Sequence, residues 1–532
     1  MYRATVYIAI FAILSKILGL ARIIVFSNRF GAGQDIDIYV AAFRVPDFIF
    51  NLLILGTLSA AFIPVFVSYL ERNRQEAFQI ASTIFNLTLL VMSAAGILGF
   101  IFAPLLVKII APGFEVAASA KTLELTRILM LSPIFLALSS VLTSVLQSFK
   151  KFVIASLAPL FYNLSIIFGV FFLYPKYGLT GIVWAVIGGA FLHFAIQLPS
   201  VLRLGLPFGR HFTLKHAGVR QIGRLFLPRI FGLDLGQIGL LISSIIGSLL
   251  PAGSIAVYYY AFDLETMPLG VFAIAFATTA FPVLSEYASK NNFAGFKSFL
   301  SKTIVQLLFL IIPISVLMLV LRAQIVRLFL GAGQNTNFSF ADTRLTALAL
   351  AFFAISLFAQ AIIPLLARAF YAMHNTLIPV LFGAVAIIIN AVLALIFTRF
   401  MSPASMALAF SAAAIFDLVC LFIFLRRRLG NDLNDDYLFL SIMKISIASV
   451  AAGTVSYAGL YLIAPVVNMQ TYLGIFLQTA GSLLLGGLAY ISAGLMIGLP
   501  EAKGFVNVIR TWFAKFSKSV TALAESLFTD LR

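Results

Sequence analysis

Four polar side chains occupy one stripe of an apolar segment near residues 36–69. Asp37, Arg44, Asp47 and Asn51 stand at positions i, i+7, i+10 and i+14, which at about 100° per residue puts them on one face of a helix. An ionisable side chain at membrane depth costs at least about 2.5 kcal/mol, so each needs a partner or a hydrated cavity. The stripe predicts either a substrate-binding strip or an interhelical Asp–Arg network that holds the fold, and both interpretations stay open.

The segment before this stripe carries two cations suited to an anionic headgroup. Ser15, Gly19 and Arg22 share one helical face, and Lys16 lies about a third of a turn away. A guanidinium can donate two parallel hydrogen bonds to a phosphate, and an ammonium adds a compact second charge. We expect Arg22, helped by Lys16, to contact an anionic headgroup; the alternative is that Arg22 snorkels to the membrane interface.

Acidic residues are prominent in the corresponding region of the second half. Asp234 follows Arg229, and Asp263 and Glu265 lie where the first half has Arg44 and its neighbours. Desolvated carboxyl groups can take up H⁺ or Na⁺, so these three acids are candidates for a coupling-ion site or for cavity walls. Asp234 is the first candidate, with a structural pair to Arg229 as the alternative. Counted together, the acids and bases of the apolar segments come close to neutrality.

These residues belong to a chain that is too hydrophobic for a soluble protein. Of the 532 residues, 62% are hydrophobic and 10% are charged, which predicts a polytopic membrane protein. Windows that could cross a hydrocarbon core of roughly 30 Å recur about fourteen times. Residues 101–110 and 307–321 are continuously apolar without the alternation of barrel strands, so the spans should be helices. The windows are 4–26, 36–69, 79–107, 124–149, 152–174, 179–202, 222–249, 254–286, 299–329, 343–372, 376–398, 403–426, 438–464 and 471–498.

A weak internal repeat predicts how the helices are organised. Tyr39–Arg44 returns as Tyr258–Asp263, and Ala61-Phe62 or Ala280-Phe281 follows at the same interval. Two apolar copies of a multi-helix unit are typical of carriers whose substrate site lies between the copies. We therefore expect an all-α polytopic membrane protein with two pseudosymmetric six-helix halves and two extra C-terminal helices. The expected boundaries are 1–205 for the first half, 206–430 for a connector and the second half, 431–498 for the extra pair, and 499–532 for an amphipathic cytoplasmic tail.

The positive charge predicts membrane orientation instead of a nucleic-acid partner. The net charge is +17, but the basic residues concentrate in alternate loops, as the positive-inside rule describes. We expect a monomer with both termini in the cytoplasm and its cations against anionic lipid headgroups. Lys16 and Arg22 interrupt the first apolar run, which therefore predicts a retained helix and not a cleaved signal peptide.

Several kinds of chemistry find no support in the sequence. Cys420 is the single cysteine, which excludes an intramolecular disulfide, and the four histidines lack metal-ligand spacing. No glycine-rich loop ends in Lys-Ser or Lys-Thr, so a nucleotide motor is not expected. No nucleophile and base form a catalytic arrangement. We expect a transporter without a cofactor, driven by H⁺, by Na⁺ or by the membrane potential, and not an enzyme.

Several motifs resemble those of one transporter family. They are Ser15–Arg22, Phe30–Gly33, Asp37, Ala42–Pro46, Tyr260–Pro268 and Arg368–Ala372 with Pro379. In these motifs the chain resembles the MurJ (MviN-like) lipid II flippases of the multidrug/oligosaccharidyl-lipid/polysaccharide exporter superfamily, over essentially its full length. The resemblance implies a carrier of the bacterial inner membrane with fourteen helices around a central cavity, the last two forming a groove for the lipid tail.

The resemblance also implies a substrate and some of its contacts. The family moves an undecaprenyl-pyrophosphate-linked peptidoglycan precursor, lipid II, between leaflets by alternating access. Arg22 and Asp37 fall on functional positions of the family, and Lys16 keeps the charge of a usual arginine. Asn51 and Asp263 stand where the family has arginines, so a flippase for another lipid-linked oligosaccharide is one alternative. A cation-coupled drug antiporter of the superfamily and a membrane scaffold without transport are two others.

Overall fold

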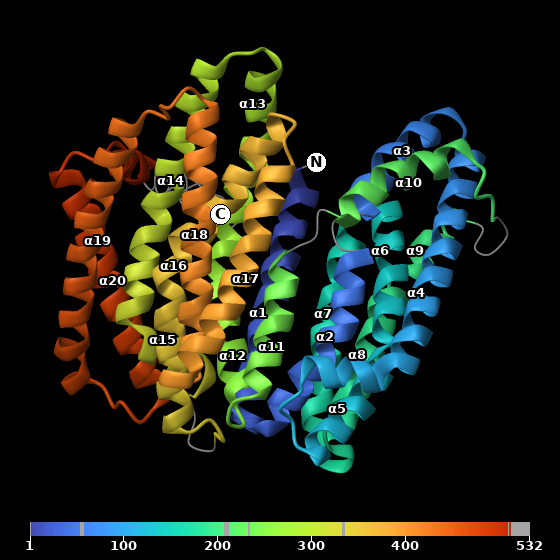
Figure 1. Cartoon of the computed structure of the whole chain (residues 1–532), viewed down its shortest axis with the longest axis horizontal. Helices are drawn as coiled ribbons and strands as arrows, with labels where there is room; N and C mark the ends of the chain where they lie inside the picture. Colours follow the sequence, from blue (N-terminus) through green and yellow to red (C-terminus); the bar gives the residue numbers. More distant parts are fainter. Residues whose placement is uncertain are drawn as a thin grey trace, which may run out of the picture. The chain divides into compact units, whose positions relative to one another are not determined.

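The computed structural model describes residues 2–53, 58–206, 212–231, 235–331, 336–508 and 510–511. These ranges are almost entirely helical and contain no β-strand (Figure 1). Helices are the expected result, because inside a lipid bilayer each backbone N–H and C=O must be satisfied within its own segment. The predicted all-α polytopic fold is confirmed.

The chain divides into two compact units that do not follow chain order. Unit 1 consists of Met1–Asp263, Val326–Ala349 and Gly383–Ala413; unit 2 consists of Leu264–Ile325, Leu350–Phe382 and Ala414–Arg532. Unit 1 therefore contains the whole predicted first half and parts of the predicted second half, whereas unit 2 comes from the predicted second half, the extra pair of helices and the tail. The predicted boundaries at 205, 430 and 498 stay predictions.

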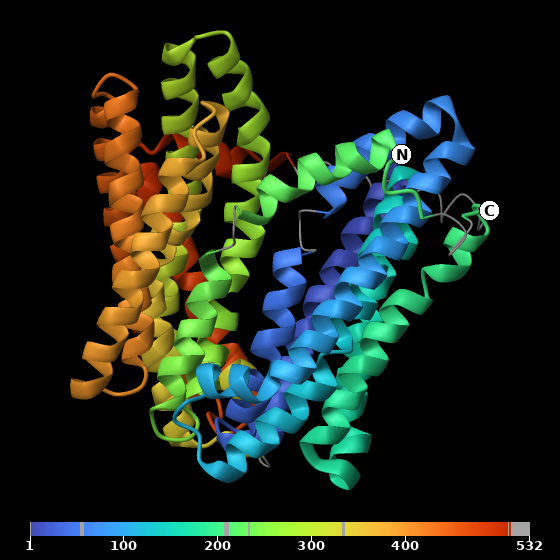
Figure 2. The same ribbon diagram turned by 45° about the vertical axis from the view of Figure 1, so that its right-hand side comes forward.

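The N-terminal part of unit 1 is a run of helices that pack on their neighbours in space. In this unit α1 packs against α7, α7 against α8, α2 against α5, and α10 against α3 (Figures 1 and 2). The helices are α1 (Tyr2–Phe30), α2 (Gln34–Leu53), α3 (Leu58–Arg72), α4 (Arg74–Ile110), α5 (Val116–Leu129), α6 (Ser132–Ser148), α7 (Phe152–Phe168), the π-helix η1 (Gly169–Leu173), α8 (Tyr174–Ala195), α9 (Leu198–Leu202), α10 (Ala217–Phe231) and α11 (Leu235–Ser248).

Several of the later helices belong partly to each unit. Within unit 2, α19 packs against α14 and α20 (Figure 1), and the Tyr490 hydroxyl of α20 donates to the Phe309 carbonyl of α14 at 2.7 Å. These helices are α12 (Ser254–Pro268), the π-helix η2 (Leu269–Ala273), α13 (Ile274–Ser289), α14 (Phe293–Val320), α15 (Arg322–Leu330), α16 (Phe340–Ala372), α17 (Leu377–Phe400), α18 (Ser405–Arg428), α19 (Asp435–Ile463), the 3₁₀-helix η3 (Ala464–Val466) and α20 (Tyr472–Met496).

The predicted number of spans is not confirmed. Among the described residues, ten helical segments are long and apolar enough to cross a membrane. The window 36–69 is two shorter helices, α2 and α3, on either side of residues 54–57. The windows 152–174 and 179–202 lie in one helical run, Phe152–Leu202, which is kinked at Gly178 with a φ of +60°. The kink at Gly178 lies in the gap between the two predicted windows.

The core of unit 1 is built from apolar side chains of α3, α4 and α6. Phe62 and Phe66 are fully buried, and their rings stack with centroids 5.0 Å apart. Ile80 of α4 and Leu142 of α6 are buried in the same cluster. Because lipid tails are as apolar as these side chains, close van der Waals packing is what favours such contacts in a membrane.

Candidate functional site

A polar cavity of about 260 Å³ lies inside unit 1. Four helices, α1, α2, α7 and α12, contribute its walls. We call it the polar cavity, since three of its lining residues are charged and three are tyrosines. The lining residues are Arg22, Ile23, Phe26, Tyr39, Val40, Phe43, Arg44, Asp47, Tyr162 and Tyr259.

Arg22 lies in the polar cavity as the sequence predicts. Its side chain is half-buried and forms no salt bridge within 4 Å with any acid of the described part. Tyr39, Tyr162 and Tyr259 line the same cavity. Lys16 is exposed and is absent from the cavity lining. Of the two cations predicted in this helix, the structure therefore places Arg22 alone in the polar cavity.

Arg44 and Asp47 bring opposite charges to the same wall. Arg44 is 9% exposed, and its Nε donates a hydrogen bond of 2.7 Å to the Ser244 hydroxyl of α11. Asp47 is exposed to the cavity although it lies in the middle of a helical bundle. The lining thus has two guanidiniums against one carboxylate, and the Asp263 carboxylate also interacts electrostatically with both arginines.

Asp37 serves a different purpose from the rest of its stripe. It is 2% exposed and absent from the cavity lining. Its Oδ2 accepts from the Gly253 backbone N–H at 2.6 Å, and its Oδ1 accepts from that of Ala256 at 2.7 Å. These N–H groups lie at the N-terminus of α12, where a carboxylate satisfies unpaired donors and complements the helix dipole. The geometry makes Asp37 a helix cap, which does not support the substrate-binding role predicted for it.

Gly253 is required for this cap. Its φ is +92°, and a Cβ at this position would clash with the Ala32 carbonyl oxygen. Glycine is the residue that adopts positive φ without steric cost and allows so close an approach. The turn between α1 and α2 therefore lies directly against the start of α12.

The remaining predicted site residues do not line the polar cavity. Asn51 is half-buried in α2. Asp263 is near the cavity arginines and interacts with the Tyr259 hydroxyl one turn earlier in α12. Asp234, and the side chain of Arg229, lie outside the described residues. The substrate and ion roles of these residues stay predictions.

Glu265 is sealed inside unit 2. It is 0% exposed, and neither carboxylate oxygen has a hydrogen-bond partner among the described residues. The side-chain amide of Gln360 on α16 faces it, and that amide donates to the Ser356 hydroxyl at 3.0 Å. An ionised carboxylate with so few compensating partners is costly in such surroundings.

The aromatic lining was not anticipated from the sequence. Phe43 and Tyr39 have ring centroids 4.7 Å apart, and Tyr39 and Phe26 are 5.0 Å apart. Tyr162 and Tyr259 come from α7 and α12. The i, i+4 spacing of Tyr39 with Phe43, and of Arg22 with Phe26, was a usable signal, because such pairs share a helix face. Tyr162 and Tyr259 reach the cavity only through tertiary packing.

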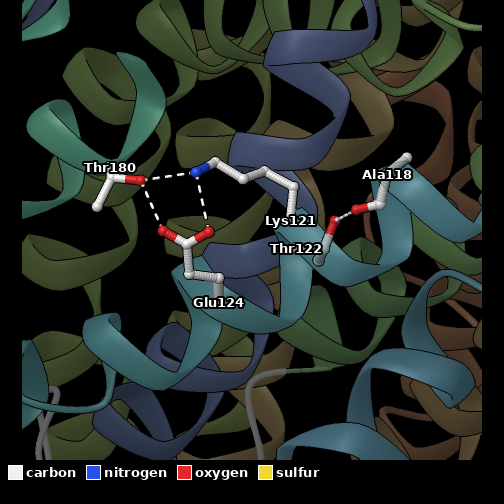
Figure 3. Close-up of polar contacts among 5 residues, drawn as sticks. All are labelled: Ala118, Lys121, Thr122, Glu124 and Thr180. Carbon is white, nitrogen blue, oxygen red and sulfur yellow. Dashed lines mark hydrogen bonds and ion pairs between the residues drawn. The ribbon is translucent and has the colours of Figure 1, made fainter. Parts of the chain in front are cut away.

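Other polar clusters in unit 1 have satisfied partners and read as structural. The Lys121 ammonium donates to Glu124 at 2.9 Å and to the Thr180 hydroxyl at 2.7 Å, and Thr180 donates to Glu124 at 2.8 Å (Figure 3). This cluster ties α5 to α8. Ser139 similarly contacts His193 Nδ1 at 2.6 Å. No group of three potential metal ligands occurs among the described residues.

A second cavity, of about 580 Å³, lies inside unit 2. We call it the apolar cavity, because aliphatic and aromatic side chains line it and Ser315 and Ser446 are the polar exceptions. Its walls come from α14, α16, α18 and α19. Of the two C-terminal helices predicted to form a tail groove, α19 lines this cavity, and α20 packs against α19 and α14 without lining it.

Comparison with known proteins identifies a family. Residues 26–481 match the model of the family described as "Lipid II flippase MurJ". The chain is 27% identical over 507 residues to the "Probable lipid II flippase MurJ" of Buchnera aphidicola subsp. Schizaphis graminum, covering 93% of this chain and 97% of that one. It is 26% identical over 474 residues to the "Lipid II flippase MurJ" of Burkholderia cenocepacia, covering 86% and 90%.

Solved structures agree on the fold. A "Lipid II flippase MurJ, inward closed conformation" superimposes with a TM-score of 0.74 at 24% identity, covering 92% of this chain and 98% of that one. An inward-facing multidrug resistance MATE family transporter of the MOP superfamily gives a TM-score of 0.64 at 15% identity, covering 81% and 99%. At these identities the likeness concerns the fold alone.

Proposed function

Since the chain belongs to the MurJ family of lipid II flippases, we propose that it carries lipid II across the membrane by alternating access. The family is one of transporters and not of enzymes, and its members are multi-pass proteins of the inner membrane. In this proposal Arg22 and Arg44 hold the diphosphate of the substrate in the polar cavity. The observation that carries the proposal is the Arg22 guanidinium, which faces this cavity without an ion-pair partner among the described residues.

The chemistry of the diphosphate explains why such a cavity is needed. A charged headgroup that enters hydrocarbon unaided loses its hydration at a cost of many kcal/mol. Guanidiniums replace that hydration with charge-assisted hydrogen bonds. Arg44 is held at Nε by Ser244, which leaves its terminal nitrogens for a phosphate oxygen. Asp47 and the nearby Asp263 keep the cavity close to neutral, so that a bound headgroup can also leave.

The polyprenyl tail needs a different environment, and the apolar cavity of unit 2 provides one. Its lining residues Leu308, Ile312, Phe358 and Phe422 are apolar and match a chain of isoprene groups. Ser315 and Ser446 add few polar atoms. We assign the tail to this cavity, which replaces a groove made by the last two helices alone.

Glu265 is the best placed of the predicted coupling acids. Glu265 is fully buried, and its carboxylate oxygens lack hydrogen-bond partners in the described part of the chain. Uptake or release of a proton therefore changes the free energy of burying this side chain strongly, because a buried charge is costly. We assign a proton, and not Na⁺, to this site. Asp263 is assigned to the polar cavity's surroundings and not to the coupling ion.

The remaining expectations complete the proposal. Both termini face the cytoplasm, the exposed loop cations contact anionic lipid headgroups, and the protein works as a monomer. A flippase for another lipid-linked oligosaccharide would use the same two cavities. This alternative differs from a lipid II flippase only in the substrate that is transported. The drug antiporter alternative is supported by the similarity in fold to a MATE family transporter. That similarity says nothing about which substrate this chain carries.

Complementation tests the proposal directly. The parent chain should restore growth to cells depleted of their lipid II flippase, and Arg22→Ala should not. Arg29→Ala is the matched control, because Arg29 lies in the same helix, is exposed and does not line the cavity. Lack of rescue by well-expressed parent chain would rule out lipid II as the cargo.

A further inference from the structure

The aromatic part of the polar cavity is not explained by a diphosphate. Phosphate recognition needs donors, which Arg22 and Arg44 supply, whereas five of the lining residues are aromatic. Asp47 balances the charge of the cavity, but its acceptor oxygens find no donor on an ionised diphosphate. The cavity therefore contains more chemistry than an anion requires.

The tyrosine hydroxyls are oriented by groups outside the cavity lining. The Tyr259 hydroxyl interacts with the Asp263 carboxylate, and the Tyr162 hydroxyl interacts with the Ser132 hydroxyl at the start of α6. Asp263 and Ser132 do not line the cavity. Both rings are thus anchored at their polar ends, and what they offer a ligand is mainly ring surface.

Anchored ring surface beside a carboxylate is a suitable environment for a sugar. The C–H groups on the face of a pyranose are apolar and pack on aromatic rings, whereas its hydroxyl and amide N–H groups need acceptors. Asp47 is exposed to the cavity and supplies two acceptor oxygens. The electrostatic environment of Asp47 contains Arg44 and Arg22, so its carboxylate is adjacent to the proposed diphosphate site.

We propose that Tyr162, Tyr259 and Asp47 form a saccharide subsite for the pyranose attached directly to the diphosphate. This inference rests on the proposed function. Tyr162 and Tyr259 stack on the ring, and Asp47 accepts hydrogen bonds from its hydroxyl or N-acetyl N–H groups. The size of the cavity limits it to this part of the substrate, since about 260 Å³ is below the roughly 300–1,000 Å³ usual for pockets that enclose a drug-sized ligand.

A comparison of two lipids tests the subsite. Binding of undecaprenyl pyrophosphate, which has no sugar, is measured beside that of undecaprenyl-pyrophosphoryl N-acetylglucosamine, with the full chain in nanodiscs. The parent should bind the sugar-bearing lipid about threefold to tenfold more tightly, the contribution expected of an aromatic contact. Tyr162→Leu, Tyr259→Leu and Asp47→Asn should each reduce that ratio, and Tyr162→Phe and Tyr259→Phe should retain most of it.

The two lipids separate the possible failures. A variant that still binds undecaprenyl pyrophosphate is folded, so a changed ratio in that variant reports on the sugar. Arg22→Ala should weaken the binding of both lipids by the same factor. If the parent binds both lipids but equally, or if the leucine and asparagine variants keep the parental ratio, the subsite is refuted while the proposed function stands. If the parent binds neither lipid, the proposed function fails and the subsite fails with it.

Discussion

The polar cavity of unit 1 and the apolar cavity of unit 2 differ in size and in lining. The first is about 260 Å³ and contains Arg22, Arg44 and Asp47 among aromatic rings. The second is about 580 Å³ and has two serines among apolar side chains. A lipid-linked saccharide has a small charged junction and a long apolar tail, which need these two environments. Under the proposed function, this difference means that headgroup recognition and tail recognition depend on separate sets of residues and can be altered separately.

The largest effect is expected from placing a charge in the apolar cavity. Leu308→Asp should abolish complementation and lower the unfolding temperature, because a carboxylate at membrane depth costs at least about 2.5 kcal/mol and Leu308 is 2% exposed. The measurements are thermal unfolding followed by fluorescence and growth rescue. Leu308→Met is the control and should behave like the parent. An unfolding temperature unchanged in the Asp variant would show that this cavity is not apolar in the membrane.

The next effect comes from removing a charge from the polar cavity. Arg22→Leu should weaken undecaprenyl pyrophosphate binding roughly tenfold to a hundredfold, as expected for hydrogen bonds to a charged group. Its unfolding temperature should not fall, because Arg22 forms no salt bridge with any of the described residues. Isothermal titration and thermal unfolding check the two statements, with Arg29→Leu as the control. A destabilised variant with intact binding would make Arg22 structural.

A smaller change tests how the polar cavity holds its second arginine. Ser244→Ala removes the hydroxyl that accepts from Arg44 Nε at 2.7 Å. The loss should be about 0.5–1.5 kcal/mol, or twofold to tenfold in affinity for undecaprenyl pyrophosphate. Ser243→Ala is the matched control, since that hydroxyl donates to the Gly239 carbonyl within the same helix. Equal effects of the two variants would contradict a positioning role for Ser244.

The smallest effect should come from a polar atom in the apolar cavity. The Ser315 hydroxyl is buried and has no hydrogen-bond partner among the described residues. Ser315→Ala should leave transport intact and raise stability by up to about 1 kcal/mol, because it removes an unsatisfied group. Thermal unfolding measures the change. A loss of transport would mean that the hydroxyl contacts the substrate and that the tail assignment needs revision.

The sequence predicts the helices of this protein better than their contacts. Continuous apolar windows locate the helices, because the requirement for internal hydrogen bonding leaves few other choices. Because a charged side chain is unfavourable in hydrocarbon, the sequence points to Arg22, Arg44 and Asp47 as candidates for a cavity. All three line the polar cavity. Periodicity puts Asp37 on the same stripe, but whether a stripe residue faces a cavity or caps another helix depends on packing. The contact of Asp37 with Gly253 joins positions far apart in the chain and leaves no local signal.

The aromatic lining shows the same limit. Tyr39 and Phe43 are recognisable as neighbours from their spacing, whereas Tyr162 and Tyr259 are ordinary tyrosines of apolar helices until α7 and α12 are brought together. The sequence likewise identifies Glu265 as an unfavourable charge in an apolar helix. It does not show that this side chain is completely buried. The sequence shows which side chains have a high free energy of burial in a membrane. The tertiary structure determines which contacts or cavities offset that free energy.

The cap of α12 by Asp37 has a consequence for how the protein is made. Its two hydrogen-bonding partners are 216 and 219 residues further along the chain. A ribosome that has just released α2 into the membrane has not yet synthesised the segment that will neutralise this carboxylate. Until α12 is inserted, the Asp37 carboxylate therefore lacks its final hydrogen-bond donors and must contact water or other groups. Its docking marks a late step of assembly.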